Sequence, residues 1–185
     1  SQSLLLVSHI DHPGQCADGL MGCLAGHEAI SRLKDQSTRL SYRMLTTVEI
    51  VGTVFYARDF VSAHNVQEAL FLEMPGTDAP VIYARTARGN ARIDRIMQHL
   101  LAHSDLSSRE VGFRESIGND EVALDVTGVN VPCGSLMQWP YPHYHSNEDK
   151  PEKINAARFE AFIDLIMRAI EVLERDAVLQ PCFSG

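Results

Sequence analysis

The chain has little of what several classes of protein require. In its 185 residues, no run approaches the roughly 18 consecutive apolar residues of a membrane-spanning helix. The opening segment reaches His9 and Asp11 too soon to be a signal peptide. We therefore expect a soluble protein that does not bind membranes.

Cysteine and positive charge are also scarce. The four cysteines contain no CxxC pair and are too sparse for a disulfide framework, which favours a reducing cytoplasm, although a single bridge stays open. Sixteen basic residues against 24 acidic ones give a net charge of −8, which opposes binding to nucleic acid or to an anionic membrane.

The chain also shows no internal repeat, no low-complexity tract and no linker. Its length suits a single domain over residues 1–185. There is no initiator methionine and the first apolar run begins almost at once, which is consistent with a domain that lacks upstream N-terminal elements. A homo-oligomer stays open.

Apolar runs alternate with helical stripes along the chain. We expect strands over residues 3–8, 40–47, 69–74, 81–85, 121–126 and 129–136. We expect helices over residues 20–34, 52–64 and 90–103, and a last helix whose apolar stripe runs from Phe159 to Leu173. This alternation predicts an α/β fold with a mixed, mostly parallel sheet and helices on both faces.

Histidines and carboxylates follow the apolar runs where strands should end. They are His9, Asp11, His12, Asp18, Glu49, Glu73, His143 and His145, the last two in a proline-containing loop over residues 138–153. Ligands of such sheets bind beyond the carboxyl ends of the strands, so these side chains should converge. Without a cation, their charges would repel one another.

Mixed nitrogen and oxygen ligands predict a zinc site, with Mn²⁺, Co²⁺ or Fe²⁺ also compatible. A carboxylate that bridges two ions, with a histidine on each side, would make a centre of two metals about 3.5–4 Å apart.

Simpler interpretations exist for single residues. Asp18 alone resembles a helix cap, Glu49 is a candidate partner of Arg43, and Glu73 is a candidate partner of Arg85. The pair His99 and His103 has the spacing of a zinc pair, but no glutamate follows His99, so we expect a structural role. For His12 and His143 we favour supporting or solvent-facing positions over direct metal contact.

Five blocks in order resemble the co-catalytic zinc aminopeptidases, and among them the aminopeptidase-like domain of bacterial biosynthetic gene clusters. The blocks are HIDHPGQCADGLMG, VEIVGTVFYARD, YARTARGNARIDR, GNDEVALDVTGVNVPCGSLM and PYPHYHSNED, between Ser8 and about Asn155. The resemblance implies the zinc aminopeptidase type of fold, which is phosphorylase/hydrolase-like.

The resemblance also implies roles for individual residues. His9 and His145 look like the histidines of the two metals, Asp18 like the bridging carboxylate, and Glu73 like a terminal ligand. Asp11 is similar to the aspartate that orients the first histidine and supports catalysis.

The clan usually has two adjacent glutamates where this chain has only Glu49. Either Glu49 is the general base and the second metal lacks a ligand, or Glu49 is a ligand and the base lies elsewhere; we favour the base. Asp120 and Glu121 are candidates for completing the site or holding the substrate's ammonium group.

The expected function is metal-dependent hydrolysis of an N-terminal residue from a peptide, or of an amino-acyl amide on a small molecule. Two alternatives stay open: an inactive domain that binds a peptide or partner, motivated by the missing glutamate, and a single-zinc cyclotransferase that acts on N-terminal glutamine.

Overall fold

Strand β1 (Ser3–His9) lies inside a six-stranded sheet, and all seven of its residues are buried. The computed structural model describes residues 1–176. The other strands are β2 (Ser41–Thr47), β3 (Val66–Glu73), β4 (Val81–Ala84), β5 (Ser108–Val111) and β6 (Cys133–Gln138). The strand order is β2-β1-β3-β6-β4-β5, and every neighbouring pair is parallel except β4 with β6. The predicted α/β class with a mixed, mostly parallel sheet is confirmed.

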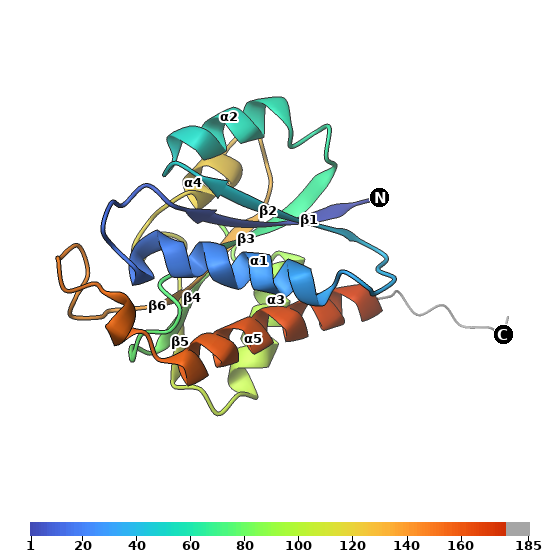
Figure 1. The fold of residues 1–185 in the computed structure, drawn as a ribbon. Coiled ribbons are helices and arrows are strands. Elements are labelled where there is room, and N and C mark those ends of the chain that lie inside the picture. Colours follow the sequence, from blue (N-terminus) through green and yellow to red (C-terminus); the bar gives the residue numbers. More distant parts are fainter. Residues whose placement is uncertain (177–185) are drawn as a thin grey trace, which may run out of the picture.

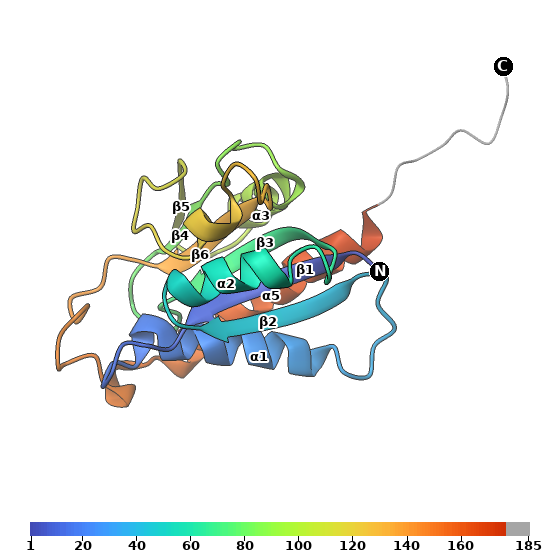
Figure 2. The same ribbon diagram turned by 90° about the horizontal axis from the view of Figure 1, so that it is seen from above.

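Helices cover both faces of this sheet, as Figures 1 and 2 show. Helices α1 (Gly22–Arg32), α3 (Arg92–Ala102) and α5 (Ala156–Arg175) pack on one face, and α2 (Val51–Asp59) and α4 (Glu121–Leu124) on the other. Two short turns, η1 (Ala17–Met21) and η2 (Pro151–Lys153), complete the elements. No helix among residues 1–176 combines the length and the apolar composition needed to cross a bilayer.

The larger core lies between the sheet and α1, α3 and α5. Phe162 and Ile166 of α5 are almost fully buried there, together with Leu72 of β3 and Tyr83 of β4. Burying such an apolar side chain contributes about 1.5–3 kcal/mol. The Asn155 side chain starts α5 by accepting hydrogen bonds from the backbone of the first turn. This core therefore fixes the sheet whose edge carries the candidate site.

The predicted strand over residues 121–126 is wrong, because that segment begins with helix α4. The Glu121 carboxylate accepts hydrogen bonds from the backbone N–H of Asn119, which favours a turn over an extended chain. Strand β5 was not predicted; it is a short edge strand whose residues are at most partly buried. The predicted strand over residues 129–136 starts later, at Cys133, and continues to Gln138.

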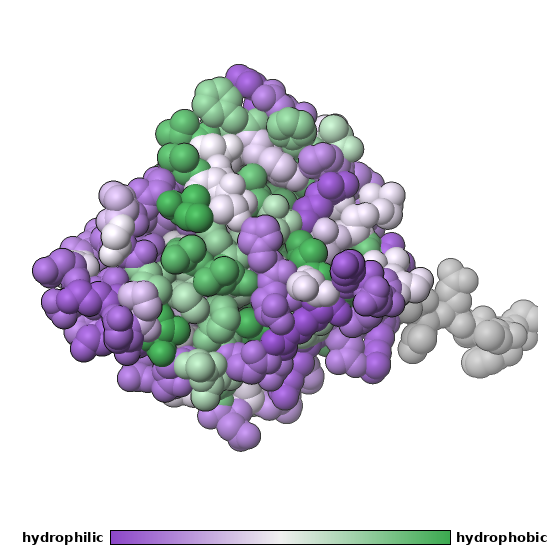
Figure 3. Space-filling model, in the orientation of Figure 1, coloured by the Kyte–Doolittle hydropathy of each residue, from purple (hydrophilic) through white to green (hydrophobic). Residues whose placement is uncertain are grey.

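Apolar side chains also reach the surface. Figure 3 shows them over α2 and α1. Val51 and Phe55 of α2 are more than half exposed, at 59% and 52%, and Leu24 of α1 is 47% exposed. Three cysteines, Cys16, Cys23 and Cys133, are free and buried, whereas Cys182 lies outside the described residues.

Candidate metal centre

The carboxyl ends of neighbouring strands place two predicted ligands side by side. His9 ends β1 and Glu73 ends β3, and these strands pair in parallel. The His9 Nε2 atom lies 2.9 Å from Glu73 Oε2, and neither side chain reaches solvent. The edge on which they lie is at the left of Figure 1.

Asp18 reaches the same place from the turn η1. Its Oδ1 atom lies 3.6 Å from His9 Nε2. Gly19 has a φ of 94°, and a Cβ atom there would lie 2.5 Å from the His9 carbonyl oxygen, so only glycine allows the turn to approach β1 this closely. The local chain thus brings an almost fully buried carboxylate over the end of the sheet.

His145 approaches Asp18 from the other side. It comes from the loop after β6, and its Nε2 atom lies 2.9 Å from Asp18 Oδ2. Tyr144 stacks on its ring, with centroids 3.8 Å apart. Asp18 therefore presents one oxygen toward His9 and the other toward His145, which is the arrangement that a bridging carboxylate needs.

His12 lies in the same cluster, although we expected only a supporting or solvent-facing position for it. One donor atom each from His9, His12 and Asp18 lie within 4.8 Å of one another. His12 Nδ1 is 3.6 Å from Asp18 Oδ1, and His12 Nε2 is 3.5 Å from Glu49 Oε2. The signal for this position was its place three residues after His9, in the same strand-end loop.

Glu49 stands at the open side of the cluster, with its side chain 30% exposed. Its backbone N–H donates to Asp11 Oδ1 at 3.0 Å, and the same Asp11 oxygen lies 3.4 Å from His9 Nδ1. Asp11 thus links the turn that carries Glu49 to the ring of His9. Glu49 faces His12, so the alternative of an ion pair with Arg43 is not what the structure contains.

The segment Asn119–Glu121 supports the site through hydrogen bonds to Glu73 and to the turn that follows Glu49. The Asn119 Nδ2 atom donates to Glu73 Oε2 at 2.8 Å. Asp120 Oδ1 accepts from the backbone N–H of Ile50 at 2.9 Å and from Thr53 Oγ1 at 2.6 Å. Burial raises the pKa of both Asp120 and Glu121, and the hydrogen bonds that each accepts oppose this effect. No sequence pattern pointed to a role for Asn119.

Asp120 holds the Glu49 turn in a strained shape. Ile50 has a φ of 57°, a left-handed conformation that β-branched residues rarely adopt. Asp120→Ala should lower the free energy of unfolding by about 1–3 kcal/mol, because the buried Thr53 hydroxyl and the part-buried Ile50 N–H lose their acceptor. Asp120→Asn keeps an acceptor oxygen and should cost less. Urea unfolding checks this order against Asp35→Ala, an exposed site; equal stability of all three would contradict the role.

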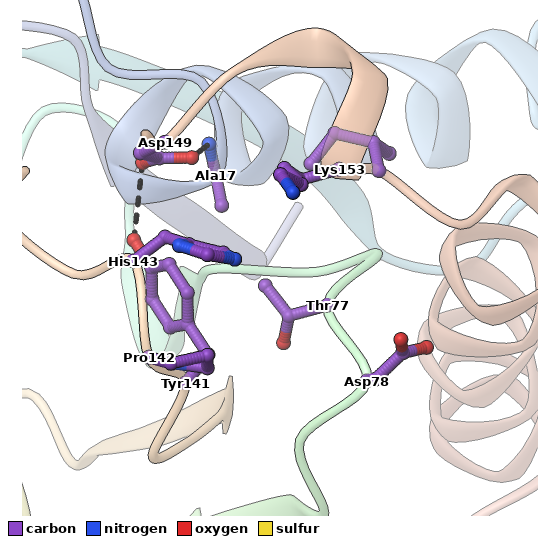
Figure 4. Close-up of a pocket in the computed structure, with 9 residues that line it drawn as sticks. Ala17, Thr77, Asp78, Tyr141, Pro142, His143, Asp149 and Lys153 are labelled. Atoms are coloured by element: carbon purple, nitrogen blue, oxygen red, sulfur yellow. Dashed lines mark hydrogen bonds between the residues drawn. The ribbon is translucent and has the colours of Figure 1, made fainter. Parts of the chain in front are cut away.

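Asp149 also supports the site, although no sequence pattern pointed to it. Its carboxylate accepts from the backbone N–H groups of Ala17 at 2.8 Å and Asp18 at 3.0 Å, and from the Tyr141 hydroxyl at 3.0 Å. It ties the loop of His145 to the turn of Asp18. Figure 4 shows the bonds to Ala17 and Tyr141.

Other candidates lie apart from this cluster. Arg85 pairs with Glu110 at 3.0 Å, and is therefore not the cation beside Glu73. His103 Nδ1 contacts the His99 carbonyl oxygen at 2.8 Å at the end of α3, in keeping with the structural role expected of that pair.

The proton affinities of His9 and Glu73 depend on each other. Burial lowers the pKa of His9, but the hydrogen bond to Glu73 and the charges of Glu73, Asp18 and Glu49 outweigh it and raise that pKa to about 9. Burial raises the pKa of Glu73 to about 7, although the bond to His9 and its charge act in the opposite direction. Glu73 therefore depends on nearby positive charge, from His9 or from a cation, to stay ionised.

The donors present fit a zinc ion. The buried atom Glu73 Oε1 has no hydrogen-bond partner among the described residues, which is costly for a carboxylate without a cation. Asp18 Oδ2 is also buried and faces His145 Nε2 at 2.9 Å. Imidazole nitrogens and carboxylate oxygens are common zinc ligands. A coordinated cation would give Glu73 Oε1 a partner.

The metal-free protein should become less stable as pH rises. The raised pKa of His9 contributes stability below its ordinary value of 6.5, and this is lost as pH passes about 9. Ionising Glu73 between its ordinary 4.5 and about 7 also opposes folding. Zinc needs deprotonated ligands, so the Tm difference between zinc-loaded and chelator-treated protein should widen from about pH 6 to about pH 9. A Tm difference that does not change with pH would contradict this coupling. So would a Glu73→Gln variant whose Tm difference widens with pH as much as that of the wild type.

Comparison with known proteins gives a relative that is longer than this chain. The chain is 30% identical over 151 residues to a Clostridium acetobutylicum protein provisionally named as a polysaccharide biosynthesis protein with an aminopeptidase-like domain. The match covers 80% of this chain and 35% of that protein. The chain therefore spans about a third of this relative.

Solved structures share the fold. A crystal structure from Clostridium acetobutylicum, provisionally described as a peptidase, superposes with a TM-score of 0.88 at 26% identity, over 94% of this chain and 42% of that one. A zinc aminopeptidase from Bacillus subtilis gives 0.76 at 16% identity, over 93% and 46%. A glutaminyl cyclase from Porphyromonas gingivalis gives 0.75 at 16% identity, over 93% and 72%.

These likenesses confirm the predicted relation to the aminopeptidase-like clan and its fold. The family itself is shown by a match over almost the whole chain. Residues 1–176 match the family described as "Domain of unknown function (DUF4910)", and the chain belongs to that family.

Proposed function

We propose that the chain is the catalytic domain of a zinc-dependent, aminopeptidase-like hydrolase. It removes an N-terminal amino acid from a peptide, or cleaves an amino-acyl amide of a peptide-like molecule. The observation that carries the proposal is the position of Asp18, whose two carboxylate oxygens face His9 and His145 at the edge of the sheet.

Four side chains would hold the metal: His9, Asp18, Glu73 and His145, with His12 as a further ligand. A bound zinc ion lowers the pKa of a water molecule toward neutrality and polarises a carbonyl oxygen. The donors on the two sides of Asp18 would suit one or two zinc ions, and they also suit Mn²⁺, Co²⁺ or Fe²⁺.

Glu49 is the proposed general base. Its carboxylate lies at the open side of the cluster, where it can take a proton from the attacking water and deliver it to the leaving nitrogen. Asp11 is the proposed supporting residue, because it accepts from the backbone of Glu49 and lies beside the ring of His9. Asp11 would thus fix the position of the Glu49 turn relative to the His9 ring.

The substrate's free ammonium group would be recognised by negative charge. Asp120 and Glu121 are our candidates for this recognition. Both are buried and their carboxylates accept hydrogen bonds from the protein, so they act through the potential that they add to the site. The acidic surroundings favour a cationic amine over an N-acylated one.

Turnover of a panel of aminoacyl p-nitroanilides tests this function. The zinc-loaded protein should release nitroaniline, lose activity with a chelator and regain it with added zinc. A zinc-loaded protein that converts no member of the panel would contradict hydrolysis and favour a binding domain.

A second candidate is a single-zinc cyclotransferase, because the glutaminyl cyclase fold matches over most of both chains. The same assay separates it when a glutaminyl peptide is included. Pyroglutamate formation from that peptide, with one zinc ion per chain, would replace the hydrolase proposal.

A further inference from the structure

A cavity of about 120 Å³ adjoins the proposed metal centre (Figure 4). Its wall includes Ala17, which precedes Asp18, and His143, which lies two residues before His145. The remaining lining residues are Thr77, Asp78, Tyr141, Pro142, Asp149, Lys153 and Ile154. The cavity thus shares its wall with the turns that carry two proposed ligands.

The acidic groups of this wall already have partners. Asp149 accepts hydrogen bonds from two backbone N–H groups and from the Tyr141 hydroxyl. Asp78 Oδ1 lies 3.4 Å from Asn155 Nδ2, and in Figure 4 its carboxylate points away from the cavity. The hydroxyl of Thr77 donates to the Gln138 carbonyl oxygen. The Asp149 carboxylate is therefore engaged by the protein, and the Asp78 carboxylate is directed away from the cavity.

The two basic side chains of the wall, Lys153 and His143, have no such partners among residues 1–176. Within residues 1–176, neither the Lys153 ammonium nor the His143 ring has a hydrogen bond or an ion pair, whereas the neighbouring Lys150 pairs with Glu148 at 3.0 Å. Figure 4 shows the Lys153 ammonium and the His143 ring directed toward the same space. Two nitrogen-bearing groups are thus available there for an acceptor.

The volume of the cavity limits the size of the chemical group that can carry this acceptor. A cavity of about 150 Å³ holds benzene, so this smaller one accepts a short side chain or a small terminal group. Tyr141, Pro142 and Ile154 supply apolar surface for a few methylene groups. A carboxylate on a short aliphatic stem fits both the apolar wall and the two donors.

We propose that this cavity binds a carboxylate of the substrate, so that the site acts preferentially on substrates that carry a free carboxylate close to the scissile bond. This inference rests on the proposed function and names its substrate class. The carboxylate has two sources: the side chain of an N-terminal glutamate or aspartate, and the free carboxyl group of a short leaving peptide.

Calorimetric titration of the zinc-loaded protein with matched ligands tests the inference. L-Glutamate against L-glutamine probes the side chain, and leucyl-glycine against leucyl-glycinamide probes the leaving group. In one of these pairs the acidic ligand should bind about tenfold more tightly, because its carboxylate makes a charged hydrogen bond that the neutral ligand cannot make. The pair that shows the difference identifies the source.

Two cavity variants and a control make the test specific. Lys153→Met should reduce the preference to near parity and His143→Gln should weaken it, whereas Lys150→Met, outside the cavity, should leave it unchanged. Lys153 is exposed, so its loss should not affect folding. Equal binding within both pairs, or a preference that survives in both cavity variants, would overturn the subsite.

Binding is measured without turnover, so the two proposals fail separately. A protein that selects acidic ligands but hydrolyses nothing would refute only the hydrolase. A protein that hydrolyses neutral and acidic anilides equally, with no selectivity in binding, would refute only the carboxylate subsite.

Discussion

Glu49→Gln should lower kcat by about 10²–10⁴-fold, the usual contribution of a general base, while zinc stays bound. The amide of glutamine has the shape of the carboxylate but cannot take a proton at neutral pH. The hydrogen bond between the Glu49 backbone and Asp11 is unaffected by this change, so the turn should keep its position. The measurement is kcat on the best anilide, together with the zinc content of the same sample.

The zinc content separates the two roles that the sequence left open for Glu49. If Glu49 is the base, the Glu49→Gln variant should bind the wild-type number of zinc ions per chain. If Glu49 is a ligand, the variant should bind less zinc. Glu171→Gln on α5 is the matched control, since this exposed residue lies outside the metal cluster and pairs with Arg175. A Glu49→Gln variant with normal turnover would refute the assignment as base.

Asp18→Asn should remove metal and activity together. Asp18 is the carboxylate that both His9 and His145 approach, so an amide in its place loses the charge that would face each ion. The loss of zinc affinity should exceed the roughly 10–100-fold that follows from removing a residue that only orients a ligand. Elemental analysis after dialysis measures the loss.

The fold should survive this substitution. The hydrogen bond that fixes the turn runs from the Asp18 backbone to Asp149, and asparagine keeps it. Asp35→Asn, an exposed site before β2, controls for the change of charge. If the Asp18→Asn protein keeps the wild-type number of zinc ions per chain, Asp18 is not the bridging ligand.

Much of the fold could be predicted because it depends on local patterns. The continuous apolar run of β1 and the stripe of α5 each indicate an element and its buried face without knowledge of any partner. The segment at Glu121 could not be predicted, because Val122 and Val126 favour a strand while a side-chain hydrogen bond to Asn119 imposes a turn.

The site divides in a similar way. The sequence by itself determined which residues of metal-binding type follow the strands, namely His9, Glu73 and, through their turns and loops, Asp18 and His145. Only the tertiary structure decided how they are held: Asp149 reaches Asp18 across 131 positions, and Asn119 reaches Glu73 across 46. Such contacts have no sequence signal, because they exist only once the packed sheet has brought distant loops to the same edge.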